Sequence, residues 1–185
     1  MGRWQGGAGE RLKEAALGLF ASKGYDGTTV AEIAAAAGLT ERTFFRHFSD
    51  KKEVLFVDQA EFERTFLDAL PERSDDPMWL ISAVLDTAAG LFPEERREWS
   101  RARQRVIDAN VALRERELLK LSALAVALTG ALTGRGIDPI SAALAAESGV
   151  TVFRTAFTVW VTPDEERGFA EIQQTVLSRL QTLLD

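Results

Sequence analysis

The sequence predicts an all-α protein of nine helices, with a small N-terminal domain and a larger C-terminal domain. Apolar residues recur three and four positions apart along most of the 185-residue chain, which is the spacing of one helix face. The chain contains neither the alternating β-branched runs nor the Asn-Gly hairpin signals that would indicate strands. Five prolines interrupt the helical pattern, and they are Pro71, Pro77, Pro93, Pro139 and Pro163.

Three short helices are predicted near the N-terminus from their start and stop signals. The first covers about Glu10–Ser22, and Gly24 stands where a left-handed C-terminal cap is needed. Thr29 starts the second helix, because Glu32 three residues later completes a capping box. The third helix covers about Thr40–His47, with the threonine as its N-terminal cap.

Six further helices are predicted in the rest of the chain. Asp50 caps the fourth, with Glu53 at the capping-box position, and this helix is expected to run to about Leu70. The last five are expected near residues 77–91, 94–110, 112–134, 139–161 and 164–184.

The composition excludes several classes of function. Without cysteine, the chain has no disulfides, thiolate catalysis or cysteine-based zinc sites, and its single histidine excludes multi-histidine metal sites. An all-carboxylate metal site remains open, but no clustered acidic loop of the calcium-binding kind is present. Nucleophile motifs and phosphate-binding loops do not occur either. We therefore expect neither an enzyme nor a bound metal or other cofactor.

The hydropathy pattern predicts a cytoplasmic protein with no membrane partner. The N-terminal segment has no apolar core of the kind found in secretory signals. The longest stretch without charge, Leu121–Gly134, has 14 residues, which is too short to span a bilayer.

The most informative segment is Thr29–Phe48, TVAEIAAAAGLTERTFFRHF, which predicts two short helices joined by a tight turn at Gly38. The small residues of Ala34–Ala37 permit close approach of the next helix. In such helix-turn-helix units, the last helix enters the major groove of DNA by its N-terminal end. The residues expected to form the core of this unit are Leu19, Phe20, Ile33, Phe45 and Phe48.

The charge distribution gives only weak support for DNA binding. Residues 1–56 hold eight lysine and arginine residues against seven aspartate and glutamate residues, a net charge of +1. The remainder carries −7, so the whole chain carries −6. The acidic part can face away from the phosphates, but charge alone would not have indicated DNA.

Residues 10–56 resemble the DNA-binding domain of the TetR/AcrR family of bacterial repressors. The matching segments are FASKGYDGTTV, AEIAAAAGLTERTFFRHF and DKKEVL, and the helix count and chain length also fit. The resemblance implies a TetR-like fold with a flexible tail over 1–9 and a helix-turn-helix domain over 10–56. It also implies a regulatory ligand-binding and dimerisation domain over 57–185.

The resemblance also implies a set of DNA-contacting residues. They are Thr29, Thr40, Arg42, Thr43, Phe44, Arg46, His47 and Lys51. Arg42 and Thr43 would lie nearest the base edges, whereas Lys51 would reach a phosphate from the start of the fourth helix. Position 45 is Phe where the family usually has Tyr, which removes one hydroxyl contact to phosphate.

Several of these residues have an alternative, structural interpretation. Thr29 and Thr40 also serve as helix caps. Arg42 and Lys51 can be solvated surface residues, and Phe44 either faces the DNA or packs inward.

Apolar residues of the middle helices are candidates to line an effector cavity, and equally candidates for ordinary core. They are Trp79, Val84, Phe92, Trp99, Val106, Leu121 and Leu124. The segment NVALRERELLKLSALAVAL resembles a TetR subgroup whose regulatory domain is similar to that of the mycofactocin-system regulator, which implies an acyl-CoA-like effector. A group of arginines either meets an anionic head group or forms a solvated face, and they are Arg96, Arg97, Arg101, Arg103 and Arg105.

The last two helices are the expected dimer interface, because the family pairs them into a four-helix bundle across a two-fold axis. The predicted helix 139–161 is apolar nearly all round, so it must be covered on more than one face. The candidate interface residues, with intrachain core as the alternative, are Val152, Phe153, Phe157, Phe169, Ile172, Val176 and Leu180.

Together these features predict a homodimeric, sequence-specific DNA-binding transcriptional regulator. The expected role is a repressor of a palindromic operator that a small-molecule effector releases. The alternative is a small-molecule-binding or scaffold protein of the same fold that does not bind DNA.

Overall fold

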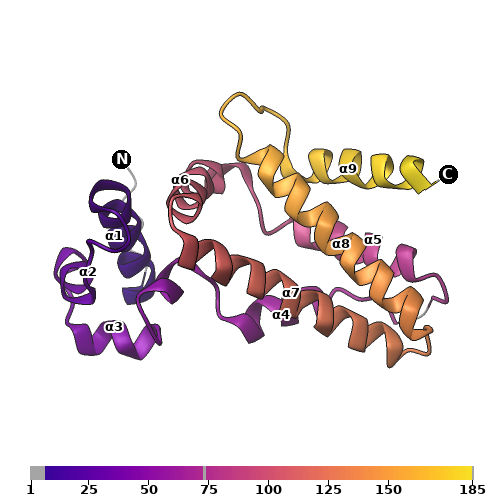
Figure 1. Cartoon of the computed structure of the whole chain (residues 1–185), viewed down its shortest axis with the longest axis horizontal. Coiled ribbons are helices and arrows are strands. Elements are labelled where there is room, and N and C mark those ends of the chain that lie inside the picture. The colour runs from indigo at the N-terminus through magenta and orange to yellow at the C-terminus, as the bar shows by residue number, and fades with distance from the viewer. Residues whose placement is uncertain (1–6, 73, 185) are drawn as a thin grey trace. The chain divides into compact units, whose positions relative to one another are not determined.

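The computed structural model describes residues 7–72 and 74–184, and every regular element among them is a helix (Figure 1). Over these residues the predicted all-α class is confirmed. The N-terminal tail was expected to cover residues 1–9, and its first six residues lie outside the described part. The first helix, α1, already begins at Ala8 and ends at Lys23. Among the described residues, no helix combines the length and apolar character needed to cross a membrane.

The chain forms two compact units. The first unit contains the residues up to Asp58 and the segment Ala102–Arg114, and the second contains Gln59–Arg101 and the residues from Glu115 onward. The helical elements of the first unit are α1, α2 (Val30–Ala36), α3 (Glu41–His47) and the 3-10 helix η1 (Lys52–Leu55). Those of the second are α4 (Gln59–Leu67), α5 (Pro77–Ala89), the 3-10 helix η2 (Glu94–Arg96), α8 (Pro139–Trp160) and α9 (Phe169–Leu184). The helices α6 (Arg97–Asp108) and α7 (Val111–Thr133) contribute residues to both units.

The core of the first unit forms where α1 packs against α2, α3 and η1. Phe20 and Ile33 are buried there, as predicted. The prediction for α3 was wrong by one residue, because Phe44 is fully buried whereas Phe45 is 55% exposed. Phe44 and Phe48 are four residues apart and their ring centroids lie 5.4 Å apart. Because residues four apart share a helix face, this pairing turns Phe45 to the outside.

The predicted caps of α2 and α3 are confirmed. The Glu32 amide donates to Thr29 Oγ1 at 3.2 Å, and the Thr29 amide donates to Glu32 Oε2 at 2.9 Å, which completes the capping box. At α3, the Thr43 amide donates to Thr40 Oγ1 at 3.2 Å. The turn between the two helices places Gly38 at φ +66°, a conformation that side chains other than glycine resist.

The predicted fourth helix is divided into η1 and α4. Asp50 does cap the start, because its Oδ1 accepts from the Lys52 amide at 2.8 Å and from the Glu53 amide at 3.2 Å. After Leu55 the chain becomes extended, with Phe56 at φ −116° and ψ 147°. The Leu55 carbonyl accepts from Arg103 Nε at 2.7 Å instead of from a following helical turn.

The segment Ala102–Arg114 belongs to the first unit although it is distant from α1–α3 in the sequence. Its apolar side chains Val106, Ile107 and Leu113 are buried. Asn110 Nδ2 donates to an Asp26 carboxylate oxygen at 3.2 Å, which ties the α6–α7 turn to the loop between α1 and α2. The helix-turn-helix is therefore supported from a second part of the chain.

In the second unit, α8 packs against α5 and α9, and α5 also contacts α4 and α9. Aromatic rings fill much of the space between these helices, with centroids 4.6 to 6.5 Å apart. The rings belong to Phe62, Phe66, Phe92, Phe153, Phe157, Trp160 and Phe169. Edge-to-face pairs of this kind add to the stability that burial alone gives.

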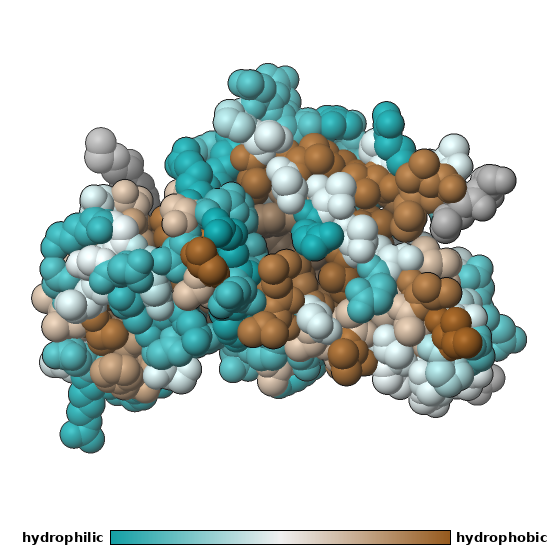
Figure 2. Space-filling view, viewed as in Figure 1, coloured by the Kyte–Doolittle hydropathy of each residue, from teal (hydrophilic) through white to brown (hydrophobic). Residues whose placement is uncertain are grey.

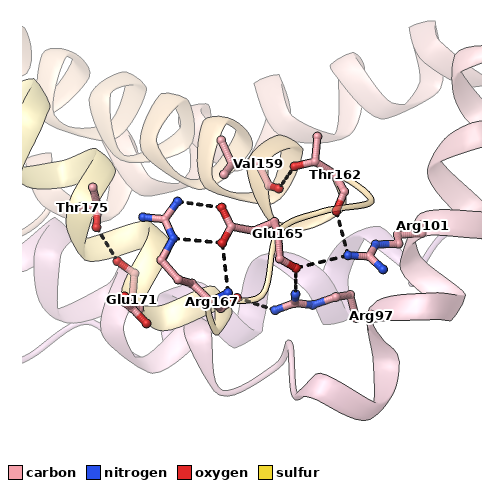
Figure 3. A network of polar contacts seen from close by, with 8 residues as sticks. All are labelled: Arg97, Arg101, Val159, Thr162, Glu165, Arg167, Glu171 and Thr175. Carbon is pink, nitrogen blue, oxygen red and sulfur yellow. Dashed lines mark hydrogen bonds and ion pairs between the residues drawn. The ribbon is translucent and has the colours of Figure 1, made fainter.

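The last helix begins at Phe169, later than the predicted residue 164, because the preceding loop is held in a non-helical form (Figure 3). The Arg97 guanidinium donates to the carbonyl oxygens of Glu165 and Arg167. The Glu165 carboxylate in turn accepts from Arg167 Nη2 at 2.6 Å, and this hydrogen bond lowers the pKa of Glu165 to about 2. Side chains thus satisfy the loop backbone in place of helical hydrogen bonds.

Two arginines at the start of α6 reach this loop. Arg97 is only 4% exposed, its guanidinium lies 5.3 Å from the Trp160 ring centroid, and it pairs with Glu94 at 2.8 Å. Arg101 Nη2 donates to the Thr162 carbonyl at 2.7 Å (Figure 3). The loop between α8 and α9 is therefore bound to α6 by planar, multi-donor groups.

Candidate DNA-binding surface and effector cavity

The outer face of α3 carries most of the predicted DNA-contacting residues. Five of them are exposed, namely Thr29, Thr40, Arg42, Arg46 and His47. Thr43 and Lys51 are partly exposed. Phe44 is fully buried in the core of the first unit, so its assignment as a DNA contact is corrected. Its burial leaves the arginines on the outside of a helix that is anchored from within.

The cap hydroxyls are compatible with a second role at the surface. Thr40 Oγ1 lies 3.1 Å from Thr43 Oγ1 and also accepts the Thr43 amide, yet Thr40 remains exposed. A hydroxyl can donate one hydrogen bond and accept two. Each threonine therefore keeps hydrogen-bonding capacity toward a partner outside the chain.

Lys51 has a structural role that sequence reasoning missed. Its Nζ donates to the carbonyl oxygens of Tyr25 at 2.7 Å and Thr28 at 2.8 Å, and it lies 4.2 Å from the Tyr25 ring centroid. Burial, followed by the nearby charge of Asp50, raises the pKa of the Tyr25 phenol. Because an ammonium has three donors, two are directed to the α1–α2 loop and one is left for a phosphate.

The acidic side chain at the start of α2 is paired within the unit. Lys23 Nζ donates to Glu32 Oε1 at 2.6 Å. This hydrogen bond, together with those from the backbone and side chain of Thr29, lowers the pKa of Glu32 to about 2. The pairing partly neutralises a carboxylate that would otherwise face an anionic partner at this surface.

A small apolar cavity of about 10 Å³ lies inside the second unit. It is lined by Phe66, Ile81, Val84, Leu85, Leu124, Leu128, Gly149, Val150 and Phe153. Of the predicted pocket residues, Val84 and Leu124 lie here. A Cβ atom at Gly149 would stand 2.5 Å from Ile81 Cγ2, so glycine is needed for the close approach of α5 and α8.

The other predicted pocket residues do not line this cavity. Trp79 is 51% exposed, because Leu80 and Val84 form the inner face of α5. Val106 is buried in the first unit. The remaining three are partly buried elsewhere in the second unit, and they are Phe92, Trp99 and Leu121. Sequence spacing could have found the inner face of α5, but it could not have found Gly149 of α8.

The arginines of η2 and α6 have several structural roles. Arg97 and Arg101 bind the α8–α9 loop, and Arg103 binds the Leu55 carbonyl and lies 4.9 Å from the Phe56 ring centroid. Arg96 lies 6.0 Å from the Trp99 ring centroid, and Arg105 is exposed. These contacts favour neither the anionic head group nor the solvated face that the sequence suggested, since three of the five guanidinium groups donate to backbone carbonyls.

Four predicted dimer-interface residues belong to the core of the chain itself, and the prediction is corrected for them. They are Val152, Phe153, Phe169 and Ile172, each at most 6% exposed. The side of α8 that carries Val152 and Phe153 faces the chain's own helices, which the sequence pattern could not distinguish from a partner. Phe157, Val176 and Leu180 are partly buried against the same core.

Other apolar side chains of these helices are exposed. Ile140 and Leu144 of α8 and Leu183 of α9 are 65% exposed or more. Figure 2 shows hydrophobic residues gathered over α9 and along α7 on the face in view. Over the described residues, no group of three or more acidic, histidine or cysteine side chains is arranged to hold a metal ion.

Two capped helices meet across a glycine turn, and the second turns its arginines outward while its aromatic ring holds it to the core. This arrangement is that of a helix-turn-helix, a unit whose second helix enters the major groove in DNA-binding proteins. Residues 12–57 match the bacterial regulatory proteins of the tetR family. The N-terminal region of the chain is therefore similar to the DNA-binding domain of this family.

Relatives that match part of the chain are named as transcriptional regulators. The regulator TcmR of Streptomyces glaucescens is 37% identical over 83 residues, which cover 44% of this chain and 37% of that protein. The repressor KstR2 of Mycobacterium tuberculosis is 38% identical over 81 residues, which cover 44% of this chain and 38% of that protein. The matches thus span little more than a third of these relatives' length.

The fold of the whole chain also has solved counterparts. The regulator FadR of Bacillus subtilis, solved in complex with stearoyl-CoA, aligns with a TM-score of 0.60 at 21% identity. The alignment covers 92% of this chain and 96% of that chain. This likeness confirms the predicted TetR-like fold beyond the helix-turn-helix.

Proposed function

We propose that this chain is a cytoplasmic, homodimeric transcriptional repressor that binds a palindromic DNA operator and releases it when an acyl-CoA-like effector binds. The observation that carries the proposal is the outer face of α3. Arg42, Arg46 and His47 are exposed there, while Phe44 anchors the helix to the core. Cationic side chains on such a helix supply phosphate contacts and base-edge contacts in the major groove.

The DNA-binding part of the proposal is tested with the full chain and random-sequence duplex DNA. Binding is expected at low salt and should weaken steeply as salt rises, because each phosphate contact releases counterions. Fluorescence anisotropy across a salt series measures this slope. No binding at low salt would instead favour the small-molecule-binding or scaffold protein of the same fold.

Arg42 and Lys51 should differ in their effect on sequence preference. Arg42→Ala is expected to relax preference at one base position, whereas Lys51→Ala should weaken binding to all sequences alike. Since Lys51 also holds the α1–α2 loop, its substitution should lower the melting temperature, which Arg42→Ala should leave unchanged. Uniform weakening by both variants would contradict the base-reading role of Arg42.

Dimerisation is proposed through the exposed faces of α8 and α9. Ile140, Leu144 and Leu183 expose apolar side chains on these helices, and large exposed apolar groups often mark an interface. Two recognition helices would then lie about 34 to 36 Å apart, or a multiple of this, on a near-palindrome. Leu144→Glu should shift sedimentation toward the monomer, whereas Val111→Glu, at a similarly exposed site of the first unit, should not.

The effector is proposed to enter the apolar cavity between α4, α5, α7 and α8. FadR of Bacillus subtilis, whose fold is similar, binds stearoyl-CoA. The cavity of about 10 Å³ is far smaller than most ligand sites, which range from about 300 to 1,000 Å³, so binding requires the helices to separate widely. Release of DNA requires the effector to favour a form that binds DNA less tightly.

Stearoyl-CoA serves as the probe for this effector class, with coenzyme A alone as the control. Titration calorimetry should detect heat with stearoyl-CoA only, and the same addition should weaken DNA binding in the anisotropy assay. Binding without any change in DNA affinity would contradict the release mechanism. No binding of stearoyl-CoA would remove the acyl-CoA assignment while leaving the DNA-binding role intact.

A further inference from the structure

Phe45 is the large hydrophobic side chain that α3 leaves exposed. The described core of the first unit is built without it, since Phe44 is fully buried and its ring meets that of Phe45 edge-on at 5.5 Å between centroids. More than half of the Phe45 surface, 55%, remains open. An apolar ring at this place therefore contributes little to the packing of its own unit.

The charged side chains near the Phe45 ring indicate the kind of partner that covers the ring. Arg42 precedes Phe45 by three residues and so shares its helix face, and Arg46 and His47 lie on other faces of the same short helix. All three side chains are exposed. Such surroundings fit a partner that offers an apolar group within an anionic surface. The major groove of DNA is such a surface, because the thymine C5-methyl lies there between two phosphate backbones.

We propose that Phe45 determines specificity by packing its ring against a thymine C5-methyl in the major groove. The inference rests on the proposed function, because α3 must enter the groove. Every base presents hydrogen-bonding groups at its major-groove edge, but thymine alone adds an apolar methyl group against which a ring can pack without covering a polar atom. Thymine is therefore the base that a phenylalanine at this position favours.

The test compares thymine with deoxyuridine, which lacks only the methyl group. A duplex is first enriched from a random pool by the full chain, and each thymine of the enriched sequence is then replaced in turn by deoxyuridine. For the unsubstituted chain, replacement of one particular thymine in each half-site should lower the binding affinity. Losing its methyl should weaken binding about fourfold, and losing both symmetric methyls about fifteenfold, as expected for removing one buried methyl per site.

The variant Phe45→Ala should bind the thymine and deoxyuridine duplexes equally, which completes a double-mutant cycle. Phe45→Tyr keeps the ring and should keep the response to the methyl. Arg42→Ala should also keep it, since this variant is expected to act at a different base. Far-UV circular dichroism should show the same melting temperature for Phe45→Ala as for the unsubstituted chain, because the side chain is exposed.

Three outcomes would overturn the proposals, and they are distinguishable. If deoxyuridine has no effect at any thymine, or weakens the unsubstituted chain and Phe45→Ala equally, the role of Phe45 is wrong while DNA binding stands. If Phe45→Ala changes the oligomeric state and not the thymine response, the ring covers a protein surface. If the chain enriches no sequence, the proposed function itself fails, and the inference with it.

Discussion

The helix-turn-helix and the second unit are stabilised in different ways. In the first, named polar atoms fix each turn, as in the capping box of Thr29 and Glu32 and the loop contacts of Lys51. In the second, seven aromatic rings and the close contact of Gly149 with Ile81 set the packing. Hydrogen-bonded caps hold a short surface helix in one orientation, whereas helices that meet mainly through apolar side chains can separate around a ligand more easily.

The largest expected effect separates two adjacent phenylalanines within the first unit. Phe44→Ala should lower the free energy of unfolding by about 3–5 kcal/mol, because it opens a cavity in the core. Phe45→Ala should change it by less than about 0.5 kcal/mol, since the side chain is exposed. Urea unfolding followed by circular dichroism measures both. Equal losses would contradict the assignment of Phe44, and not Phe45, to the core that holds α3 in place.

The next largest loss of stability is expected from substituting Arg97, which anchors the α8–α9 loop of the second unit. Arg97→Met is expected to lower the free energy of unfolding by about 2–3 kcal/mol, because the Glu165 and Arg167 carbonyls lose a charged donor. Hydrogen exchange should speed up in the α8–α9 loop. Arg105→Met, on the same helix but exposed, is the matched control. Unchanged exchange in the loop would show that aromatic packing alone holds it.

Two glycine substitutions examine the apolar packing of the second unit. Gly149→Ala should destabilise by about 1–3 kcal/mol, because its Cβ would stand 2.5 Å from Ile81 Cγ2. Gly130→Ala should stabilise by about 0.4–1 kcal/mol, because that site in α7 is exposed and the added Cβ would meet no atom within 4 Å beyond its own helix backbone. Thermal unfolding gives the sign of both changes. A stabilising Gly149→Ala would show that α5 and α8 separate easily.

The smallest effect concerns pH and the capping box. The pKa of Glu32 lies at about 2, below its ordinary value of 4.5, so its stabilising contribution is present above pH 4.5 and is lost as pH falls from 4.5 toward about 2. Glu32→Gln should flatten the stability profile in that interval. Glu41→Gln, an exposed site on α3, should leave the profile unchanged. An unaltered slope in Glu32→Gln would assign the acid sensitivity to other groups.

The same contrast explains what the sequence could predict. Caps and the glycine turn depend on residues within three or four positions, so Thr29, Gly38 and Thr40 were identified correctly. Two neighbouring phenylalanines at 44 and 45 gave no local reason to choose the inward one. These features can be predicted because they depend on neighbouring residues. The prediction was wrong only where two adjacent residues are chemically alike.

In the second unit the deciding contacts are long-range. An all-round apolar helix requires cover on several faces, but nothing in its pattern distinguishes its own chain from a partner, and Val152 and Phe153 were misassigned for this reason. The contact of Ile81 with Gly149 joins residues far apart in the sequence. The cavity that this contact helps to shape was therefore found only in part, through Val84 and Leu124.

The loop between α1 and α2 is restrained three times over. Lys51 binds two of its carbonyls, Asn110 binds Asp26, and Thr28 Oγ1 donates to the Gly24 carbonyl at 2.8 Å. Redundant restraints make single losses mild and combined losses larger than their sum, since residues in one network are not additive. The start of the helix-turn-helix should thus tolerate individual substitutions well, and fail abruptly once two of its restraints are gone.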